Sequence, residues 1–364
     1  MKIAFRADAS LNIGTGHVMR CLTLADALKA IGSQCHFICR EHPGNLIKEI
    51  RQRGFSVIGL PKNTDDWMTG RSLDTDRSSY DAWLGADSIT DAAQTIVSIG
   101  DAEFDWLIVD HYAIDVSWEQ QLRAKCRKVM VIDDLADRPH DCNLLLDQNL
   151  GRHVQDYNEL VPADCSVLAG PTYALLRPEF AALRDYSLRR REIPQLKNIL
   201  ISMGGVDRDN TTGRILDALI ECPLPDDLSI TVVMGQHAPW LERVRLLAAR
   251  MPRRTEVKVN VKDIARLMAD SDLAIGAAGG TSWERCCLGL PTFIVVLAEN
   301  QRKAAVALEH TGSAKVLDGL DAIEVKLRSM LNLQSMSSGL HQMSRVSCLI
   351  TDGLGTSRVV RELL

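Results

Sequence analysis

The stretch Ile13-Gly14-Thr15-Gly16-His17-Val18-Met19-Arg20 decides the fold of this chain. It follows the short apolar segment Lys2–Arg6, and it runs into the periodic segment Met19–Leu28. This order predicts a strand, a glycine turn and a helix, because glycine permits a tight turn and a close approach to the backbone. The first amides of such a helix lack partners within the helix, so the turn can hold an anion or another polar ligand.

His17 falls on the first turn of this predicted helix. The positive end of the helix dipole disfavours an imidazolium there, so we expect a neutral ring that can take up a proton. A plainer interpretation is that Gly14 and Gly16 only shape the turn and that His17 caps the helix. The glycine pair by itself favours the plainer interpretation. The motifs in the rest of the chain favour a functional site at this turn.

Length and composition indicate a globular protein of two domains. The chain has 364 residues, more than one ordinary core holds, with 46% hydrophobic and 24% charged residues. The net charge of −5 gives no reason to expect a nucleic-acid partner. No apolar run approaches the roughly 20 residues of a membrane span, so we expect no membrane contact. The chain opens on a predicted strand and helix, so we expect no signal peptide.

The ten cysteines do not follow a metal-binding or disulfide pattern. Cys35 and Cys39 flank an apolar strand, and Cys286-Cys287 are adjacent on a predicted helix. There is no CxxC pair and no His/Cys spacing suited to zinc. Reduced thiols that act as small hydrophobic side chains fit this placement, which favours a cytoplasmic protein.

The N-terminal half alternates short apolar segments with helical periodicity, which predicts a parallel sheet. The predicted strands are Lys2–Arg6, Cys35–Cys39, Phe55–Ile58, Trp106–Val109, Lys128–Ile132, Leu144–Leu146 and Val167–Leu168. Ligands bind beyond the carboxyl ends of such strands. Because Gly14–His17, Asp110-His111-Tyr112 and Asp133-Asp134 all follow strands, we expect them on one rim of the sheet.

The polar segment 61–87 interrupts this alternation and carries Trp67, Tyr80 and Trp83. Loops of this length are uncommon in compact domains and often cover a site. A plain surface excursion fits the segment equally well, so both interpretations stay open.

A domain boundary is expected where two prolines, Pro171 and Pro178, precede the basic run Arg189–Arg191. The run is interpreted as a solvated helix end rather than a phosphate-binding patch. We therefore expect a first domain over 1–175, a linker over 176–194 and a second domain over 195–364 that ends in a helical tail.

The second half repeats the order of strand, glycine turn and helix at Gly204-Gly205 and at Gly279-Gly280. Backbone amides at such turns can bind phosphate oxygens. Glu284 lies one helical turn past the second pair, where a carboxylate can accept both hydroxyls of a ribose. A first-turn acid favoured by the helix dipole is the plainer interpretation. Neither a P-loop nor a GxGxxG fingerprint is present, and both halves are expected to be Rossmann-type α/β domains.

Gly14–His17, Gly279–Glu284 and the two Rossmann-like halves together resemble the two-domain nucleotide-sugar glycosyltransferase fold called GT-B. That resemblance implies an inter-domain cleft. The broad likeness is to the enzyme that adds N-acetylglucosamine to the peptidoglycan lipid precursor, although that enzyme has a longer glycine loop before its histidine.

More of the chain is similar to the UDP-2,4-diacetamido-2,4,6-trideoxy-β-L-altropyranose hydrolases of pseudaminic acid biosynthesis. The matching segments are 6–8, 16–22, 109–112, 132–138, 146–149, 170–180 and 203–207. Together they are far more specific than one glycine turn, and with the two glycine-rich turns they span most of the chain up to about Gln301.

This resemblance implies a metal-independent, cofactor-free hydrolase of a UDP-sugar, in which water attacks the anomeric carbon with inversion and UDP leaves. It makes His17 the general base, places Tyr112 near the sugar and assigns the ribose to Glu284. The implied substrate-binding residues are Gly14, Thr15, Gly16, Tyr112, Gly204, Gly205, Gly279, Gly280, Thr281, Ser282, Glu284, Asn300 and Gln301.

Three alternatives stay open: a glycosyltransferase of the same fold, a spore-coat polysaccharide protein with a similar N-terminal loop, and a non-catalytic nucleotide-sugar-binding protein. A metal held by Asp110, His111, Asp133 and Asp134 is disfavoured, because single acids at strand ends more often make structural hydrogen bonds. The expected partner is the small-molecule UDP-sugar alone, bound by a monomer.

Overall fold

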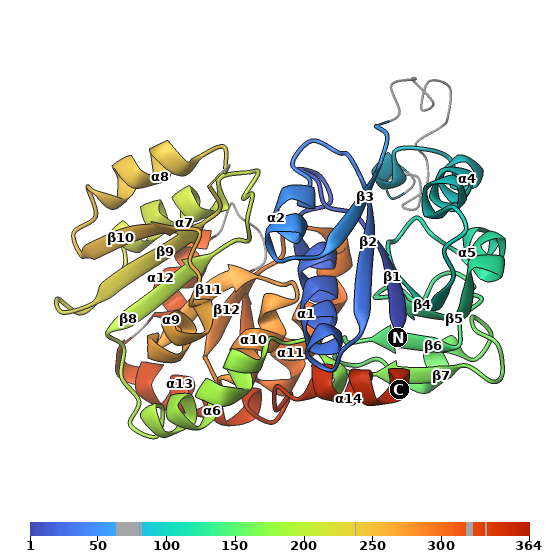
Figure 1. Cartoon of the computed structure of the whole chain (residues 1–364). Coiled ribbons are helices and arrows are strands. Elements are labelled where there is room, and N and C mark those ends of the chain that lie inside the picture. The colour runs from blue at the N-terminus through green and yellow to red at the C-terminus, as the bar shows by residue number, and fades with distance from the viewer. Residues whose placement is uncertain (63–79, 81, 237, 318–322, 332) are drawn as a thin grey trace. The chain divides into compact units, whose positions relative to one another are not determined.

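Each unit of the chain is built on one parallel sheet (Figure 1). The computed structural model describes residues 1–62, 80, 82–236, 238–317, 323–331 and 333–364. They divide into two compact units, one formed by Met1–Leu175 with Thr356–Leu364 and the other by Leu176–Gly355. Within the described residues, no helix is both long and apolar enough to cross a membrane.

The first sheet has the strand order β3-β2-β1-β4-β5-β6-β7, and all neighbouring strands are parallel. Its strands are β1 (Lys2–Ala7), β2 (Gln34–Arg40), β3 (Ser56–Leu60), β4 (Phe104–Asp110), β5 (Cys126–Ile132), β6 (Leu144–Asp147) and β7 (Ser166–Ala169). The order reverses between β1 and β4, which pair in register from Ile3 opposite Trp106 to Ala7 opposite Asp110. Open α/β sheets bind ligands beyond the strand ends at such a reversal.

Helices cover both faces of the first sheet, because successive side chains of a buried strand point to opposite sides. Phe5 of β1 belongs to the same core cluster as Leu22, whereas its neighbour Ala4 belongs to the cluster of Ala92 and Trp118. The helices are α1 (Gly16–Ala30), α2 (Ile47–Gln52), α4 (Ser88–Ile99), α5 (Val116–Leu122) and α14 (Gly355–Leu363), with the 3-10 turns η1 (Arg123–Lys125), η2 (Val154–Tyr157) and η3 (Pro171–Tyr173).

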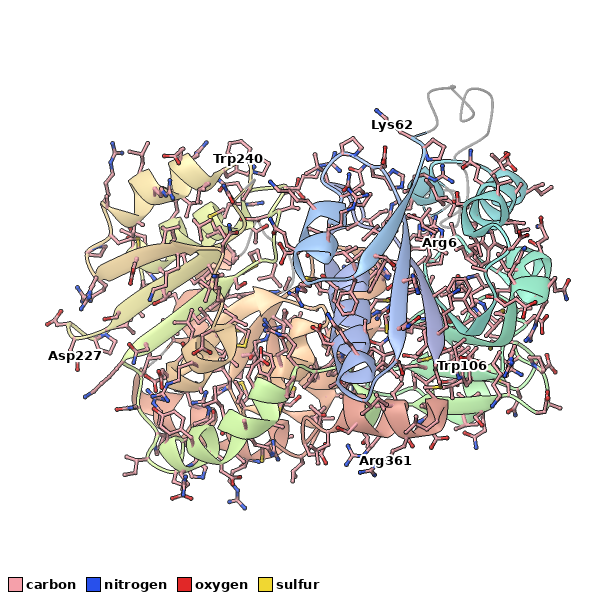
Figure 2. The ribbon with its side chains drawn as sticks, viewed as in Figure 1. Arg6, Lys62, Trp106, Asp227, Trp240 and Arg361 are labelled. Atoms are coloured by element: carbon pink, nitrogen blue, oxygen red, sulfur yellow. The ribbon has the colours of Figure 1, made fainter. Side chains whose placement is uncertain are left out.

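The last helix, α14, belongs to the first unit, which corrects the expected assignment of 195–364 to one domain. Val359 and Leu363 are buried in the core cluster of β1 and α1. The indole of Trp106 donates a hydrogen bond to the Leu363 carbonyl at 3.0 Å, while Arg361 lies on the exposed face of α14 (Figure 2). The apolar face of α14 therefore completes a core that the first 175 residues leave open.

The expected linker 176–194 also needs correction, because it contains helix α6 (Pro178–Arg190), which is part of the second unit. Arg191 at its end is buried, and its guanidinium donates to the Ser271 and Met268 carbonyls at 3.0 Å each. The basic run is thus a helix end, as expected, but Arg191 is packed rather than solvated.

The second sheet has the order β10-β9-β8-β11-β12-β13, again fully parallel, with its reversal between β8 and β11. Its strands are β8 (Asn198–Ser202), β9 (Ser229–Met234), β10 (Arg254–Val259), β11 (Leu273–Ala277), β12 (Thr292–Val295) and β13 (Ala314–Leu317). The last of these strands, β13, is not predicted from the sequence. Its helices, besides α6, are α7 (Thr211–Ile220), α8 (Leu241–Ala248), α9 (Ile264–Asp270), α10 (Thr281–Cys287), α11 (Arg302–Thr311), α12 (Ile323–Met330) and α13 (Leu333–Ser347), with the 3-10 turn η4 (Glu299–Gln301).

Leu363→Ala is expected to lower the free energy of unfolding by about 2–5 kcal/mol, because it removes a buried side chain and leaves a cavity. The neighbouring Leu364 is 76% exposed, so Leu364→Ala is the matched control and is expected to change little. Urea denaturation followed by circular dichroism measures both variants. Equal effects of the two substitutions would contradict the assignment of α14 to the first core.

Candidate active site

His17 and Asp110 meet at the reversal of the first sheet. Gly14 holds a φ of +80°, which glycine adopts without strain, and its amide donates to the Ser10 carbonyl at 2.9 Å. This loop after β1 places His17 on the first turn of α1, while Asp110 ends the adjacent strand β4. His17 Nδ1 lies 2.6 Å from an Asp110 carboxylate oxygen.

The hydrogen bond to Asp110 decides which ring nitrogen of His17 carries the proton. A carboxylate accepts hydrogen bonds, so Nδ1 is the protonated nitrogen of the neutral ring and Nε2 is the one that can accept a proton. The His17 side chain is 9% exposed, so most of the ring is shielded from solvent. This is the arrangement of a general base that is oriented by a carboxylate.

Arg20 keeps the Asp110 side chain ionised. Its Nε and Nη2 atoms contact the two carboxylate oxygens at 2.6 and 2.7 Å. Burial alone would raise the pKa of Asp110, but the charge of Arg20 and the hydrogen bonds from Arg20 and His17 outweigh burial and hold that pKa well below its usual range. Asp110 is therefore a carboxylate at neutral pH, which maintains the acceptor that His17 Nδ1 requires.

Asp134, after β5, joins Arg20 to Tyr112. One oxygen of Asp134 accepts from Arg20 Nη1 at 2.7 Å and from the Tyr112 hydroxyl at 2.8 Å, and the other accepts from Asn149 at 3.1 Å. The Tyr112 ring in turn lies edge-on to the His17 imidazole, with ring centroids 4.6 Å apart. Asp134 thereby fixes both side chains that flank His17.

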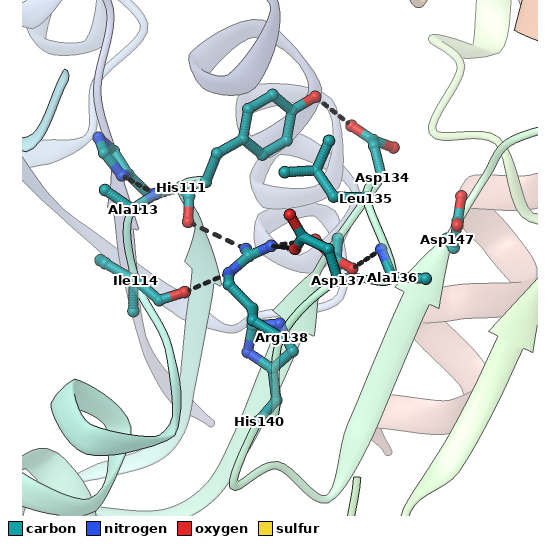
Figure 3. A network of polar contacts seen from close by, with 12 residues as sticks. His111, Ala113, Ile114, Asp134, Leu135, Ala136, Asp137, Arg138, His140 and Asp147 are labelled. Carbon is teal, nitrogen blue, oxygen red and sulfur yellow. Dashed lines mark hydrogen bonds and ion pairs between the residues drawn. The ribbon is translucent and has the colours of Figure 1, made fainter. Parts of the chain in front are cut away.

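Arg138 connects the loops that carry Tyr112 and Asp134 (Figure 3). Its guanidinium donates to the Ile114 carbonyl at 2.8 Å and to the carboxylate of Asp133 at 2.8 Å. Figure 3 shows Arg138 between the segment after β4 and the segment after β5. This buried cation therefore holds two strand ends of the rim at a defined spacing.

Trp83 and Tyr80 extend the cluster around His17. The Trp83 ring stacks on Tyr112 with centroids 5.8 Å apart, and Tyr80 meets Trp83 edge-on at 5.0 Å. From the sequence, Trp83 and Tyr80 are recognisable only as aromatic residues of the segment 61–87. The expectation that this segment covers a site falls mostly on residues 63–79 and 81, which lie outside the described residues.

His111 and Asp133 serve the fold rather than the rim surface. His111 Nδ1 accepts from the Ala113 amide at 3.1 Å, and burial lowers the pKa of His111 to about 3, so the ring is neutral. Both oxygens of Asp133 are engaged, one by Arg138 and the other by the Ala136 amide at 2.8 Å. Across the described part of the chain, no group of three or more His, Cys, Asp or Glu side chains is arranged to hold a metal ion.

In the second unit, Gly204-Gly205 follows β8 at the reversal of the sheet. Gly204 has a φ of +87°, a conformation that favours glycine. The Asp207 carboxylate accepts from the Thr211 and Thr212 amides at 2.9 and 3.0 Å. Asp207 therefore occupies the first two amides of α7, and the amides predicted to bind phosphate are those of the glycine turn before it.

The turn Gly279-Gly280 follows β11, which is the neighbour of β8. A Cβ atom added to either glycine would meet nothing within 4 Å, so the space before α10 is open. Thr281 begins α10 and is exposed, whereas Ser282 is buried and its hydroxyl accepts from Arg285 at 3.0 Å. Ser282 therefore has its hydroxyl turned inward, and only its backbone belongs to the turn.

Glu284 lies on α10 next to this turn and is largely shielded, with 16% of its side chain exposed. Burial raises the pKa of Glu284, against the opposing charges of Arg177 and Arg285. The Arg177 guanidinium lies 3.5 Å from the Glu284 carboxylate. Arg177 falls within the matching segment 170–180, and no local pattern in the sequence identifies it as a partner of Glu284.

Asn300 and Gln301 lie in η4 after β12, and β12 is the neighbour of the strand β11 that leads to the Gly279 turn. The Gln301 side-chain oxygen accepts from the Leu297 amide at 3.1 Å, so the side-chain NH₂ group of Gln301 is the part that can donate to a ligand. The second unit therefore gathers Gly204, Gly205, Gly279–Ser282, Glu284, Asn300 and Gln301 at the ends of three adjacent strands. The first unit gathers Gly14–His17 and Tyr112 in the same way.

The topology of both units is matched among solved structures. MurG of Acinetobacter baumannii has a TM-score of 0.70 at 18% identity, covering 100% of this chain and 99% of MurG. The spinosyn rhamnosyltransferase SpnG, solved with thymidine diphosphate, has a TM-score of 0.65 at 14% identity, covering 99% and 100% of the two chains. At these identities the likeness establishes the fold, which is the GT-B class that the sequence predicts.

The sequence itself is similar to three proteins. A UDP-2,4-diacetamido-2,4,6-trideoxy-β-L-altropyranose hydrolase of Campylobacter jejuni is 28% identical over 86% of this chain and 97% of its own, which confirms the resemblance expected from the motifs. An uncharacterized protein of Methanocaldococcus jannaschii is 26% identical over 83% of this chain, and the spore coat polysaccharide biosynthesis protein SpsG of Bacillus subtilis is 30% identical over 55%. The chain spans 57% and 58% of those two relatives. No family model matches.

Asp110→Asn is expected to disturb the protonated Nδ1 of His17 without unfolding the protein. Long-range ¹H–¹⁵N NMR at neutral pH is expected to find the Nδ1-protonated tautomer of His17 in the wild type. In the variant the Nδ1 proton signal should move upfield or disappear by exchange, because the charged acceptor is lost. Asp137→Asn, which changes a nearby carboxylate outside the His17 contacts, is the control. A wild-type His17 protonated on Nε2 would contradict this geometry.

Proposed function

We propose that this protein hydrolyses a UDP-linked sugar, releasing UDP and the free sugar. The observation that carries the proposal is the His17–Asp110 pair, which presents a proton-accepting Nε2 beside an aromatic cluster. The Campylobacter jejuni relative supports the choice of reaction, because its name is that of a UDP-diacetamido-trideoxy-sugar hydrolase. The proposed donor is the same UDP-2,4-diacetamido-2,4,6-trideoxy-β-L-altrose, on a route to pseudaminic or a related nonulosonic acid, in the cytoplasm.

In the proposed reaction His17 Nε2 removes a proton from water as the water oxygen attacks the anomeric carbon. The bond from that carbon to the diphosphate oxygen breaks, and its electron pair leaves with UDP. Attack opposite the leaving group inverts the configuration. Asp110 stabilises the imidazolium that forms, and a positioned base of this kind contributes roughly 10²–10⁴-fold to the rate.

The second unit is proposed to hold the nucleotide. Glu284 accepts the two ribose hydroxyls, and the backbone amides of Gly204-Gly205 and Gly279–Ser282 face the diphosphate. UDP is already a good leaving group, so amides that stabilise its charge suffice and the reaction requires no metal or cofactor. Asn300 and Gln301 are proposed to contact the phosphate or the sugar.

The aromatic cluster of the first unit is proposed to hold the sugar. A deoxy sugar with acetamido groups presents methyl groups and apolar C–H faces, which pack well against aromatic rings. Tyr112 and Trp83 supply such faces next to His17. Gly14, Thr15 and Gly16 are proposed to leave room for substrate at the start of α1.

A glycosyltransferase of the same fold is the second candidate, favoured by the likeness to MurG and SpnG. It would transfer the sugar to an acceptor instead of water. Incubation of the purified protein with the candidate UDP-sugar alone, followed by NMR of the anomeric signal, separates the two. Free sugar of inverted configuration supports hydrolysis, consumption only after an acceptor is added supports transfer, and binding without product over hours supports a nucleotide-sugar-binding protein.

His17→Ala is expected to lower turnover by about 10²–10⁴-fold, because the base is lost. UDP affinity by calorimetry should stay unchanged, since the nucleotide is assigned to the other unit. His153→Ala changes an exposed histidine of the same unit and is the control. Near wild-type turnover of His17→Ala, in the same NMR assay, would refute the mechanism.

UDP affinity is expected to fall as the pH drops through the raised pKa of Glu284, because protonation removes an acceptor for the ribose hydroxyls. The loss should begin at a higher pH than an ordinary glutamate would give. Glu284→Gln has no ionisable group at this position, whereas UDP titrates in the same way with both proteins. The difference between the wild-type and variant pH profiles therefore reports the ionisation of Glu284 alone. Calorimetry at several pH values measures both. Parallel profiles would contradict the assignment of the ribose to Glu284.

A further inference from the structure

Two cysteine sulfurs lie close together at the amino ends of strands β6 and β7. The Sγ atoms of Cys142 and Cys165 are 3.5 Å apart. Cys142 lies two residues before β6 and Cys165 immediately before β7, and these strands pair in register with Leu144 opposite Ser166. A disulfide has sulfurs about 2.05 Å apart, so bond formation needs the two atoms to approach by only about 1.5 Å.

We propose that Cys142 and Cys165 are a peroxide-reactive dithiol that closes reversibly into a disulfide. The site is separate from the proposed hydrolysis, because it lies at the opposite end of the sheet from Asp110, which ends β4. It is therefore a modification site for small hydroperoxides rather than part of the sugar chemistry.

The two thiols differ in access, which assigns their roles. Cys165 is partly exposed and ends a turn in which its amide donates to the Pro162 carbonyl at 2.9 Å, with exposed Ala163 and Asp164 beside it. Cys142 is 1% exposed. An oxidant from solvent therefore reaches Cys165 first, and Cys142 is the resolving thiol.

The segment around Cys142 is held firmly by its neighbours. The Asp141 amide donates to Glu119 at 2.6 Å, and the Asn143 amide donates to the Val129 carbonyl at 2.8 Å. The turn of Cys165 has exposed residues instead, so it is the side that must move when the bond forms.

Local electrostatics favour the thiolate of Cys165. The hydrogen bond with Cys142 lowers the pKa of Cys165, helped by the Arg123 charge, and outweighs burial and the Asp164 charge, which act in the opposite direction. The hydrogen bond and burial raise the pKa of Cys142, which stays a thiol. By contrast, burial raises the pKa of Cys21 and Cys39, which disfavours their reaction.

The disulfide forms in two steps. The Cys165 thiolate attacks a hydroperoxide oxygen, so the O–O bond breaks, sulfur is oxidised to the sulfenic acid, and the peroxide is reduced to an alcohol or water after taking one proton. The Cys142 thiol then displaces the sulfenic hydroxyl as water and forms the S–S bond. An external thiol reverses the bond by exchange.

The experiment treats the native protein with hydrogen peroxide, alkylates the remaining thiols under denaturing conditions and measures the intact mass. Eight of the ten cysteines should be alkylated, and peptide mapping should find Cys142 joined to Cys165. A thiol reductant should restore all ten. Ten free thiols after treatment, or bridges scattered among other cysteines, would overturn the proposal.

Variants test the assigned roles. Cys142→Ser should leave Cys165 as a sulfenic acid that dimedone labels, whereas Cys165→Ser should give neither the bridge nor a label on Cys142. Cys126→Ser, a partly buried cysteine of the same unit, is the control and should keep the bridge. Dimedone on Cys142 rather than Cys165 would overturn the order of attack. The peptide map of the oxidised wild-type protein tests the bridge without any variant. A variant that fails to fold therefore does not prevent that test.

Discussion

The buried carboxylate of Asp110 is the group on which the first unit depends. It ends the central strand β4 and accepts hydrogen bonds from His17 and Arg20, so one charge orients the proposed base and is itself kept ionised. Removing Arg20 would leave the buried charge of Asp110 without its cation, which is costly in a protein interior. Arg20 also contacts Asp134, and the hydroxyl of Tyr112 bonds the same residue, so the base and the aromatic cluster share one network.

The second unit repeats this topology with a different chemistry at the strand ends. Where the first sheet presents an imidazole and carboxylates, the second presents two glycine turns and one shielded glutamate. Amides and open space suit a diphosphate, and a carboxylate suits a diol. The proposed division of tasks, with chemistry in one unit and nucleotide binding in the other, rests on these side chains.

The sequence predicted most strands and the fold class, because buried parallel strands are short apolar runs and glycine turns follow them. It did not predict what depends on contacts between distant segments. Helix α14 packs on β1 and α1 although some 350 residues separate them. His17 was recognisable from its position after the glycine turn, whereas its partner Arg20 emerged only from the spatial arrangement of Asp110 and Asp134.

In the proposed reaction, water activated by His17 attacks the anomeric carbon of a UDP-sugar. Hydrolysis in ¹⁸O-labelled water, with the released UDP analysed by mass spectrometry, shows which bond the water breaks. Attack at carbon leaves the original oxygen on the diphosphate, so we expect UDP without ¹⁸O. UDP that carries ¹⁸O would mean attack at phosphorus and would rule out this mechanism.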